Sequence, residues 1–264
     1  MKMAVSNIGW EAGSDELVYD WMKKHGFSGL EIAPTRIFAN NPYGQLEKAR
    51  VWSEELKDKF GFIIPSMQSI WYGRQEKIWG FEKERQTLMD YTKKAIDFAS
   101  IIGCKNLVFG CPRNRCMPED ADLNVAVSFF RELGDYAWEQ GTVIGMEANP
   151  IIYDTNFIID TISALDLIDQ VNSHGFLLNL DVGTMIYNEE NISRLKGKVK
   201  FINHVHISEP GLRPIKDREI HKELMNLLSE EDYKGYISIE IGKLDKLDML
   251  RENIVYVSKI FGEN

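Results

Sequence analysis

The chain has 264 residues, of which 44% are hydrophobic and 27% are charged, and its formal net charge at pH 7 is −9. This length and composition are typical of a globular protein with enough apolar material for a sizeable core. Its apolar runs end well short of the ~20 residues that cross a bilayer, and its negative charge disfavours polyanions, so we expect no membrane span and no nucleic-acid partner.

The N-terminus and the cysteines indicate the cellular compartment of the protein. Residues 1–6 run directly into a strand pattern without the apolar core of a signal peptide, which predicts a cytoplasmic protein. Cys104, Cys111 and Cys116 are odd in number and lack a CxxC spacing, so we expect reduced thiols and no disulfide framework or zinc knuckle. The sequence leaves open whether copies of the chain form a homo-oligomer.

Runs rich in β-formers alternate along the chain with segments of helical periodicity, which is the pattern of a parallel sheet. The pattern predicts eight strands, over residues 3–8, 29–33, 62–68, 106–110, 143–147, 176–181, 201–207 and 236–241. It predicts eight helices after them, over residues 15–25, 46–59, 82–102, 120–140, 156–172, 192–196, 218–228 and 246–260. Because eight strand–helix pairs within about 250 residues fit a closed barrel, we predict an α/β fold, a (β/α)8 TIM barrel.

No linker, low-complexity tract or shift in composition divides the chain, so we predict one domain over residues 1–264. The longest irregular stretches, 34–45 and 69–80, follow strand ends, where barrel enzymes place substrate loops, and they are candidate lids. Glycines follow six of the predicted helices at places where a left-handed residue would end the helix, namely Gly26, Gly61, Gly103, Gly141, Gly175 and Gly235.

Four consecutive predicted strands end in side chains that bind metal ions, namely Glu147, Asp181, His206 and Glu240. A buried carboxylate is costly unless it is paired or coordinated, so these groups at equivalent strand ends imply a shared counter-charge. Three carboxylates and one imidazole form a ligand set that consists mainly of oxygen. This set suits one divalent ion, Mn²⁺ or Mg²⁺, and admits Co²⁺ or Zn²⁺.

Each of these residues has another interpretation when it is taken alone. Asp181 fits a helix N-cap, Glu240 a surface ion pair, and His206 a hydrogen-bonded core histidine. Their coincidence on four strands favours the metal site. Because side chains alternate along a strand, His204 should point the same way as His206 from deeper in the barrel. Glu31, in the second predicted strand, is expected either to hydrogen-bond in the interior or to support the ligands.

The segment 29–32, the four ligand strands and the tail 233–240 resemble the xylose isomerase-like barrel superfamily, in particular its sugar-phosphate isomerase/epimerase branch, which includes the ketose 3-epimerases. The resemblance spans essentially the whole chain. It implies one metal ion held by Glu147, Asp181, His206 and Glu240. It also implies that the two glutamates exchange a proton next to a carbonyl through an enediolate. A metal-dependent isomerase or epimerase of a small sugar, sugar phosphate or related polyol is therefore expected.

Contacts with the carbohydrate substrate are expected at the same end of the barrel. Asn149 follows the first ligand, and Arg213 lies after the seventh predicted strand, where family members often carry a substrate-binding arginine. Thr184 stands three residues after Asp181, where the family commonly has a histidine. Because threonine cannot carry charge, the sequence departs here from the known ketose 3-epimerases.

Three further residues are candidates for substrate binding, each with an alternative. Arg113 and Arg115 follow the fourth predicted strand and form either a clamp for a phosphate or carboxylate or part of a solvated loop. His221, near the start of a predicted helix, either reaches the barrel mouth or stays on the helix surface.

Three other functions remain open. An inosose dehydratase-like lyase would use the same metal ion and the same proton abstraction. An endonuclease IV-like DNA repair enzyme would need three metal ions, for which the five histidines of this acidic chain are few. A non-catalytic sugar-binding barrel is the third, and the presence of both glutamates disfavours it.

Overall fold

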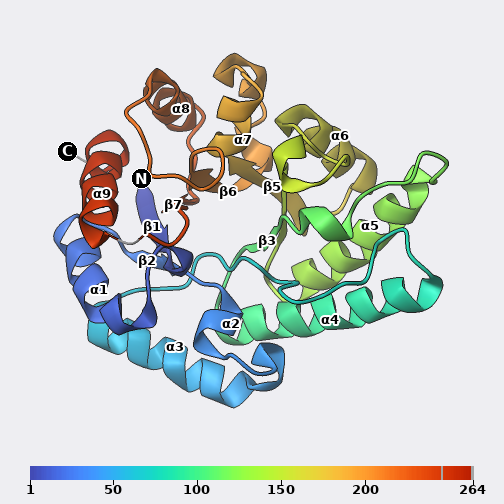
Figure 1. The fold of residues 1–264 in the computed structure, drawn as a ribbon, viewed down its shortest axis with the longest axis horizontal. Helices are drawn as coiled ribbons and strands as arrows, with labels where there is room; N and C mark the ends of the chain where they lie inside the picture. Colours follow the sequence, from blue (N-terminus) through green and yellow to red (C-terminus); the bar gives the residue numbers. More distant parts are fainter. Residues whose placement is uncertain (245, 263–264) are drawn as a thin grey trace.

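A ring of helices surrounds a curled parallel sheet in the computed structural model, which describes residues 1–244 and 246–262 (Figure 1). The strands are β1 (Lys2–Ser6), β2 (Gly29–Glu31), β3 (Leu107–Phe109), β4 (Ile144–Glu147), β5 (Phe176–Asp181), β6 (Ile202–Ile207) and β7 (Tyr236–Ile239). Within the described residues they form one seven-stranded sheet in the order β2-β1-β7-β6-β5-β4-β3, with parallel pairing throughout. The predicted TIM-barrel fold is confirmed.

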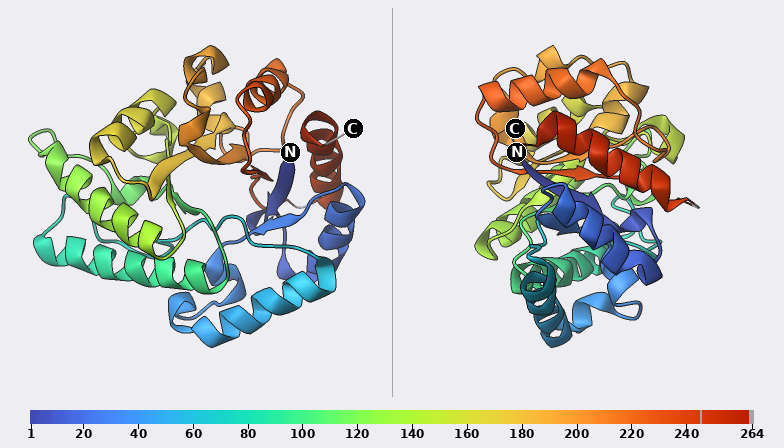
Figure 2. Two further views of the ribbon diagram at one scale, coloured as in Figure 1. Left: turned by 180° about the vertical axis from the view of Figure 1, so that it is seen from behind. Right: turned by 90° about the vertical axis from the view of Figure 1, so that its left-hand side faces the viewer.

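The longer helices pack on the outside of this sheet (Figures 1 and 2). They are α1 (Asp15–Lys24), α3 (Leu46–Phe60), α4 (Glu82–Ile101), α5 (Leu123–Glu139), α6 (Thr161–Val171), α8 (Glu219–Glu230) and α9 (Leu247–Phe261). Seven of the predicted helices therefore exist. The predicted start of α6 at residue 156 is wrong, because the Asp160 side chain accepts a hydrogen bond from the Ser163 N–H (2.8 Å) and caps the helix there.

Three short helical segments complete the comparison with the predicted elements. The segment predicted as a helix over residues 192–196 is a 3-10 helix, η6 (Ile192–Leu195). Two short α-helices, α2 (Pro34–Ile37) and α7 (Val182–Tyr187), were not predicted. Both follow strands at the end of the barrel where the predicted ligands lie.

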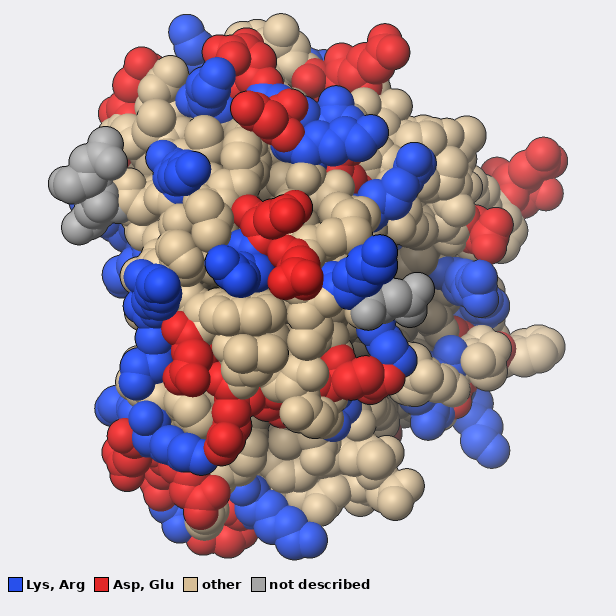
Figure 3. Space-filling view, turned by 60° about the vertical axis from the view of Figure 1, so that its left-hand side comes forward, with Lys and Arg blue, Asp and Glu red and all other residues tan. Residues whose placement is uncertain are grey.

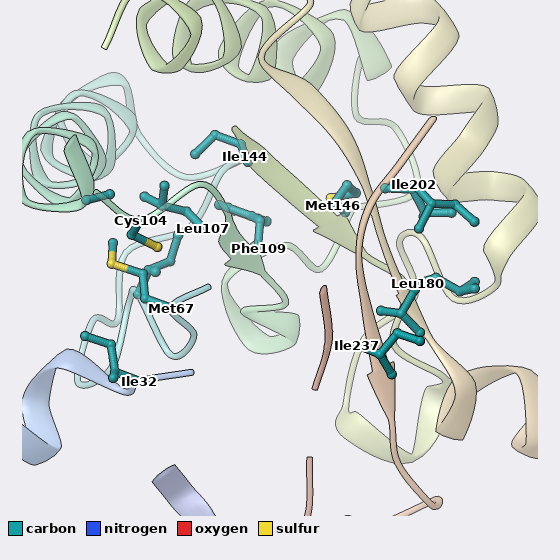
Figure 4. Packing of buried hydrophobic residues seen from close by; sticks show 14 of the residues in the cluster. Ile32, Met67, Cys104, Leu107, Phe109, Ile144, Met146, Leu180, Ile202 and Ile237 are labelled. Carbon is teal, nitrogen blue, oxygen red and sulfur yellow. The ribbon is translucent and has the colours of Figure 1, made fainter. Parts of the chain in front are cut away.

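The barrel closes between β2 and β3 through residues 62–68, which were predicted as a strand. Met67 forms isolated parallel bridges to Ile32 on one side and to Leu107 of β3 on the other. Figure 4 shows these three side chains in one part of the core. The prediction of a continuous strand is wrong, because Pro65 lacks an N–H and interrupts the hydrogen-bond ladder.

The core between helices and sheet follows from the helical spacing of apolar residues. In α5, the buried side chains of Ala126, Phe130, Leu133 and Ala137 recur every three or four residues and so share one face. Phe130 stacks on Phe176 of β5 with the ring centroids 5.0 Å apart. Contacts of this kind fix α5 against the sheet and thereby fix the strand ends that carry the predicted ligands.

The start of β1 lies beside the end of α9 (Figure 1). The Met1 amino group donates a hydrogen bond to the Phe261 carbonyl oxygen (2.9 Å). Among the described residues, no helix is long and apolar enough to cross a membrane. One domain over residues 1–264 stays a prediction, and residues 245 and 263–264 lie outside the described part of the chain.

Four of the six predicted glycine caps are left-handed, with φ between 71° and 76°: Gly26, Gly61, Gly103 and Gly141. The predictions for Gly175 and Gly235 are wrong. Asn172 and Asp232 take the left-handed conformation near those helix ends instead. Gly175 has a different role, because a Cβ there would lie 2.0 Å from the carbonyl oxygen of Gly134 in α5.

We predict that Gly175→Ala destabilises the barrel, because the added methyl group would force α5 away from the start of β5. The free energy of unfolding should fall by about 1–3 kcal/mol, the usual cost of overpacking. Gly13→Ala is the matched control, since a Cβ at Gly13 meets nothing within 4 Å. Urea unfolding followed by circular dichroism measures both variants. Equal midpoints for the two would contradict the close packing at Gly175.

Candidate active site

Strand pairing brings the predicted ligands to one end of the barrel. Glu147 at the end of β4 stands opposite Asn179 of β5, and Asp181 at the end of β5 stands opposite His206 of β6. Glu240 directly follows β7, and its N–H donates a hydrogen bond to the carbonyl oxygen of Ile207 in β6. Because all strands are parallel, these side chains share the carboxyl end of the sheet, as the sequence predicts.

A cavity of about 180 Å³ opens at this end of the barrel, and we call it the mouth cavity. Three of the four predicted ligands, Glu147, Asp181 and Glu240, line it. Residues that connect the strands complete its wall, among them Gln68, Asn149, Tyr153 and Leu212.

His206 lies at the centre of the carboxylates. Its Nδ1 atom is 2.9 Å from Oε1 of Glu147 and 3.1 Å from Oε2 of Glu240. Its Nε2 atom is 2.9 Å from Oε2 of Glu31 on the opposite side of the ring. All four residues are buried. Possible ligand atoms of Glu147, His206 and Glu240 lie within 4.8 Å of one another, close enough to bind one ion.

Burial and this crowding of charge shift the pKa values. Burial works to lower the pKa of His206, but the charges of Glu240 and Glu31 hold it well above the ordinary value. Burial raises the pKa of Glu240 to about 7, against the opposing charge of His206. Burial, with the charge of Glu147, raises the pKa of Asp181 as well. The site therefore binds protons tightly where a cation could replace them.

Asp181 lies on the cavity wall but outside the three-residue group. Its carboxylate accepts hydrogen bonds from the N–H of Gly183 (3.3 Å) and of Thr184 (2.8 Å), so it caps α7. It also accepts from the hydroxyl groups of Ser208 and Thr184. Asp181 is therefore a helix N-cap, which is the alternative interpretation given for it from the sequence. The surface ion pair weighed for Glu240 is absent, since that residue is buried.

A second group of metal-type side chains lies deeper, formed by Glu31, His204 and His206. His204 Nε2 is 3.1 Å from Oε2 of Glu31 and 2.8 Å from the Ser238 hydroxyl. The other oxygen of Glu31 accepts from the Gln68 amide (3.1 Å). Although burial works to raise the pKa of Glu31, the two histidines hold it well below the ordinary value. Glu31 is therefore an ionised acceptor at the back of His206.

A chain of side-chain amides crosses the barrel and ends on Glu147. Asn203 donates to Asn106 (2.9 Å), and Asn106 donates to Asn179 (3.2 Å). Asn179 then donates to Oε1 of Glu147 (3.0 Å). Each amide accepts on its oxygen and donates from its nitrogen, so the chain has one direction. It presents a hydrogen-bond donor to Glu147 and so helps to hold that carboxylate in place.

A second chain of donors reaches Glu147 from Arg115. The guanidinium group is fully buried, and its Nη2 donates to the Asn149 oxygen (2.9 Å). Asn149 donates in turn to Oε2 of Glu147 (3.0 Å). No salt bridge to Arg115 occurs among the described residues, and burial lowers its pKa to about 10. Arg115 thus lies behind the cavity wall and reaches the site through Asn149.

The other predicted substrate residues lie outside the mouth cavity. Thr184 is buried and donates to the Ala148 carbonyl oxygen (2.8 Å) as well as to Asp181. Arg213 is exposed, and its Nε donates a hydrogen bond to the Pro210 carbonyl oxygen (3.1 Å). His221 is buried in α8, with Nδ1 2.9 Å from the Tyr256 hydroxyl, so it neither reaches the mouth nor lies on the surface. Arg113 is exposed at the rim.

The sequence analysis missed several residues of the site. Asn179 has a signal in the sequence, because it stands two residues before Asp181 and strand alternation turns it toward the same side. Gln68 ends the predicted third strand in the same way. Tyr153 and Leu212 carry no such signal, since they lie in segments whose path depends on tertiary contacts. One such contact is the bond from the Gly211 N–H to the Tyr153 hydroxyl (2.9 Å).

Comparison with solved structures finds the same barrel in other proteins. The apo form of 3-keto-D-glucoside 4-epimerase from E. coli matches with a TM-score of 0.75 and 16% identity, over 98% of this chain and 99% of that one. D-psicose 3-epimerase from Clostridium cellulolyticum H10 matches with a TM-score of 0.75 and 15% identity, over 99% of both. A probable 3-DHS dehydratase from Bacillus anthracis matches with a TM-score of 0.69 and 15% identity, over 98% of this chain and 99% of that one.

At such low identity these likenesses show the fold alone. A search of curated proteins found no significant match. The sequence profile of one family, described as xylose isomerase-like TIM barrel, matches residues 19–257, which is most of the chain. The chain therefore belongs to the xylose isomerase-like TIM barrel family, as the sequence predicts.

Proposed function

We propose that this chain is a divalent-metal-dependent isomerase or epimerase that moves a proton next to the carbonyl of a small sugar, sugar phosphate or related polyol. The observation that carries the proposal is that ligand atoms of Glu147, His206 and Glu240 lie within 4.8 Å of one another, beside a cavity that both glutamates line. The names of two similar structures, a 3-keto-D-glucoside 4-epimerase and a D-psicose 3-epimerase, support this class of reaction.

The donor set fits a divalent cation. Nδ1 of His206 can carry only one proton, yet carboxylate oxygens of both Glu147 and Glu240 lie about 3 Å from it. A cation in place of that proton would satisfy both carboxylates, and Asp181 on the cavity wall would be the fourth ligand. Mn²⁺ and Mg²⁺ suit this set best, and Co²⁺ or Zn²⁺ would be accepted. When bound, the ion would polarise a carbonyl group and make the adjacent C–H more acidic.

The two cavity glutamates are suited to proton transfer. Glu240 lines the mouth cavity, and without a bound ion burial raises its pKa to about 7, so its carboxylate is basic enough to accept a proton from a substrate. Glu147 receives hydrogen bonds from Asn149 and Asn179, which hold its carboxylate in place. Because the two come from different strands, β4 and the end of β7, they can approach a small substrate from two directions.

A dehydratase is the second candidate, because it would use the same carboxylates for the first step and then expel hydroxide. The name of one similar structure, a probable 3-DHS dehydratase, supports this second candidate. The products separate the two reactions, since an epimerase returns an isomer and a dehydratase releases water.

The endonuclease and the non-catalytic barrel have less support. In the described part of the chain, the two groups of metal-type ligands share His206, so they cannot bind metal ions independently of each other. An endonuclease IV-like enzyme would need three metal ions. The face in Figure 3 intersperses acidic with basic side chains and shows no continuous basic track among the residues described there. A carbohydrate is therefore the proposed partner. The absence of a nucleic-acid partner and the cytoplasmic location stay predictions.

We predict about one divalent ion per chain, bound more tightly as pH rises. Glu240, with a pKa near 7, and His206, with a raised pKa, must lose protons to coordinate the ion. Low pH keeps those protons in place, so the Mn²⁺ affinity should rise by about tenfold per pH unit for each proton released. Titration calorimetry between pH 6 and 8 measures stoichiometry and affinity together. Three ions per chain, no binding, or a pH-independent affinity would contradict the site.

We predict that Glu31→Gln weakens Mn²⁺ binding, although Glu31 lies on the far side of His206 from the proposed ion. The ionised carboxylate orients the ring and makes Nδ1 a better donor, and loss of such a partner typically costs 10–100-fold in metal affinity. Glu219→Gln, at an exposed position on α8, is the control and should bind Mn²⁺ as the wild type does. An unchanged affinity in Glu31→Gln would show that the ring is held by other contacts.

We predict that Glu147→Gln and Glu240→Gln each lower kcat by about 10²–10⁴-fold at saturating Mn²⁺, because the amide keeps the shape and loses the basicity. The barrel should remain folded and should retain some metal ion. Proton exchange into ketoses and inosose-type compounds in D₂O is the measurement, with Glu219→Gln as the control. Near-normal exchange in Glu240→Gln would place the base elsewhere.

A further inference from the structure

A second cavity adjoins the mouth cavity, and we call it the rim groove. It has a volume of about 380 Å³ and is formed by three segments, within residues 71–77, 111–114 and 152–154. It shares Cys111, Pro112 and Tyr153 with the mouth cavity. The mouth cavity alone, at about 180 Å³, is smaller than the ~300–1,000 Å³ usual for ligand sites, so a ligand that occupies both cavities fits better.

Hydrogen bonds fasten two walls of the rim groove to each other. The buried Asn114 amide donates to the carbonyl oxygens of Arg74 (3.1 Å) and Glu76 (2.8 Å). In return, the Ile78 N–H donates to the Asn114 carbonyl oxygen (3.0 Å). Lys77 Nζ donates to the carbonyl oxygen of Arg113. The groove is therefore built by the fold, because each wall holds the other in place.

The charge of the rim groove is opposite to that of the mouth cavity. Three cationic residues line it, Arg74, Lys77 and Arg113, with Asp154 as its one acidic lining residue in the described chain. Glu76 neutralises Arg74. Lys77 is in no ion pair among the described residues. Arg113 meets Asp154 at 3.4 Å with both side chains over 70% exposed, a geometry that contributes little.

We propose that the rim groove binds the phosphate group of a sugar phosphate whose carbonyl end occupies the mouth cavity. The carboxylates of the mouth cavity would repel an anion, whereas Lys77, and Arg113 with its weak exposed pair to Asp154, attract one. A phosphate monoester carries almost two charges and three acceptor oxygens, more than a carboxylate, and so gains most from two cations. The orientation of the sugar rests on the proposed function, but phosphate binding by the groove does not.

Arg113 therefore stays a proposed anion ligand. Lys77 replaces Arg115 as the second cation, because Arg115 is buried. Sequence spacing alone pairs Arg113 with Arg115, two residues away. The fold instead turns Arg115 inward to Asn149 and brings Lys77 to Arg113 from another loop.

The first test measures inorganic phosphate binding by titration calorimetry in the absence of sugar. The wild type should bind phosphate, and the double variant Lys77→Met/Arg113→Met should bind it at least about tenfold more weakly, because two charge-assisted contacts are lost. Both side chains are exposed, and circular dichroism checks that the variant is folded. Lys222→Met, on α8, removes a cation outside the groove and should bind phosphate as the wild type does. Equal binding by the double variant, or none by the wild type at millimolar phosphate, would overturn the proposal.

The second test compares matched pairs of a ketose and its phosphate for proton exchange in D₂O. The wild type should prefer the phosphate in kcat/KM, and in the double variant that ratio should fall at least about tenfold toward one. Exchange of free ketoses with no preference for phosphates would defeat this inference alone. Phosphate binding without exchange of any ketose would instead defeat the proposed function. If acetate competes as well as phosphate in the calorimeter, the groove is a carboxylate site and our assignment is wrong.

Discussion

The imidazole of His206 contacts three buried carboxylates, and the arrangement of the barrel mouth follows from that imbalance. His206 contacts Glu31 through Nε2 and both Glu147 and Glu240 through Nδ1. Burying charged groups costs free energy unless each is paired and hydrogen-bonded. One imidazolium cannot neutralise three carboxylates, so the remaining cost is offset by donors from neighbouring strands and by tightly held protons. A divalent cation would neutralise the excess more completely.

The ring of His206 divides the site into two sides with different surroundings. On the inner side, Glu31 is fixed by two histidines and the Gln68 amide, away from the cavity. On the outer side, Glu147 and Glu240 line the mouth cavity, where a substrate can reach them. The amides that end on Glu147 extend the fixed inner structure to one of these two carboxylates. Contacts inside the barrel thus orient the His206 ring and the Glu147 carboxylate, while proton transfer would take place in the mouth cavity.

The sequence allowed the fold to be predicted, and it placed the four proposed ligands at one end of the sheet, because strand alternation and parallel order determine which residues share that end. It did not allow the surroundings of those ligands to be predicted. Asp181 caps α7, a helix too short to leave a periodic pattern, and Pro65 interrupts the expected third strand. The directions of Arg115, Arg213 and His221 depend on contacts with distant segments, which spacing along the chain does not encode.

The most direct test of the central claim is the ¹⁵N NMR spectrum of histidine-labelled protein recorded with and without Zn²⁺, a diamagnetic substitute for the proposed ion. Nδ1 of His206 should lose its proton and shift to the range of a metal-bound nitrogen, while Nε2 should keep the proton that it shares with Glu31. A change at Nε2 instead of Nδ1, or no change in His206 at saturating Zn²⁺, would contradict a metal ion held between this ring and the two cavity glutamates.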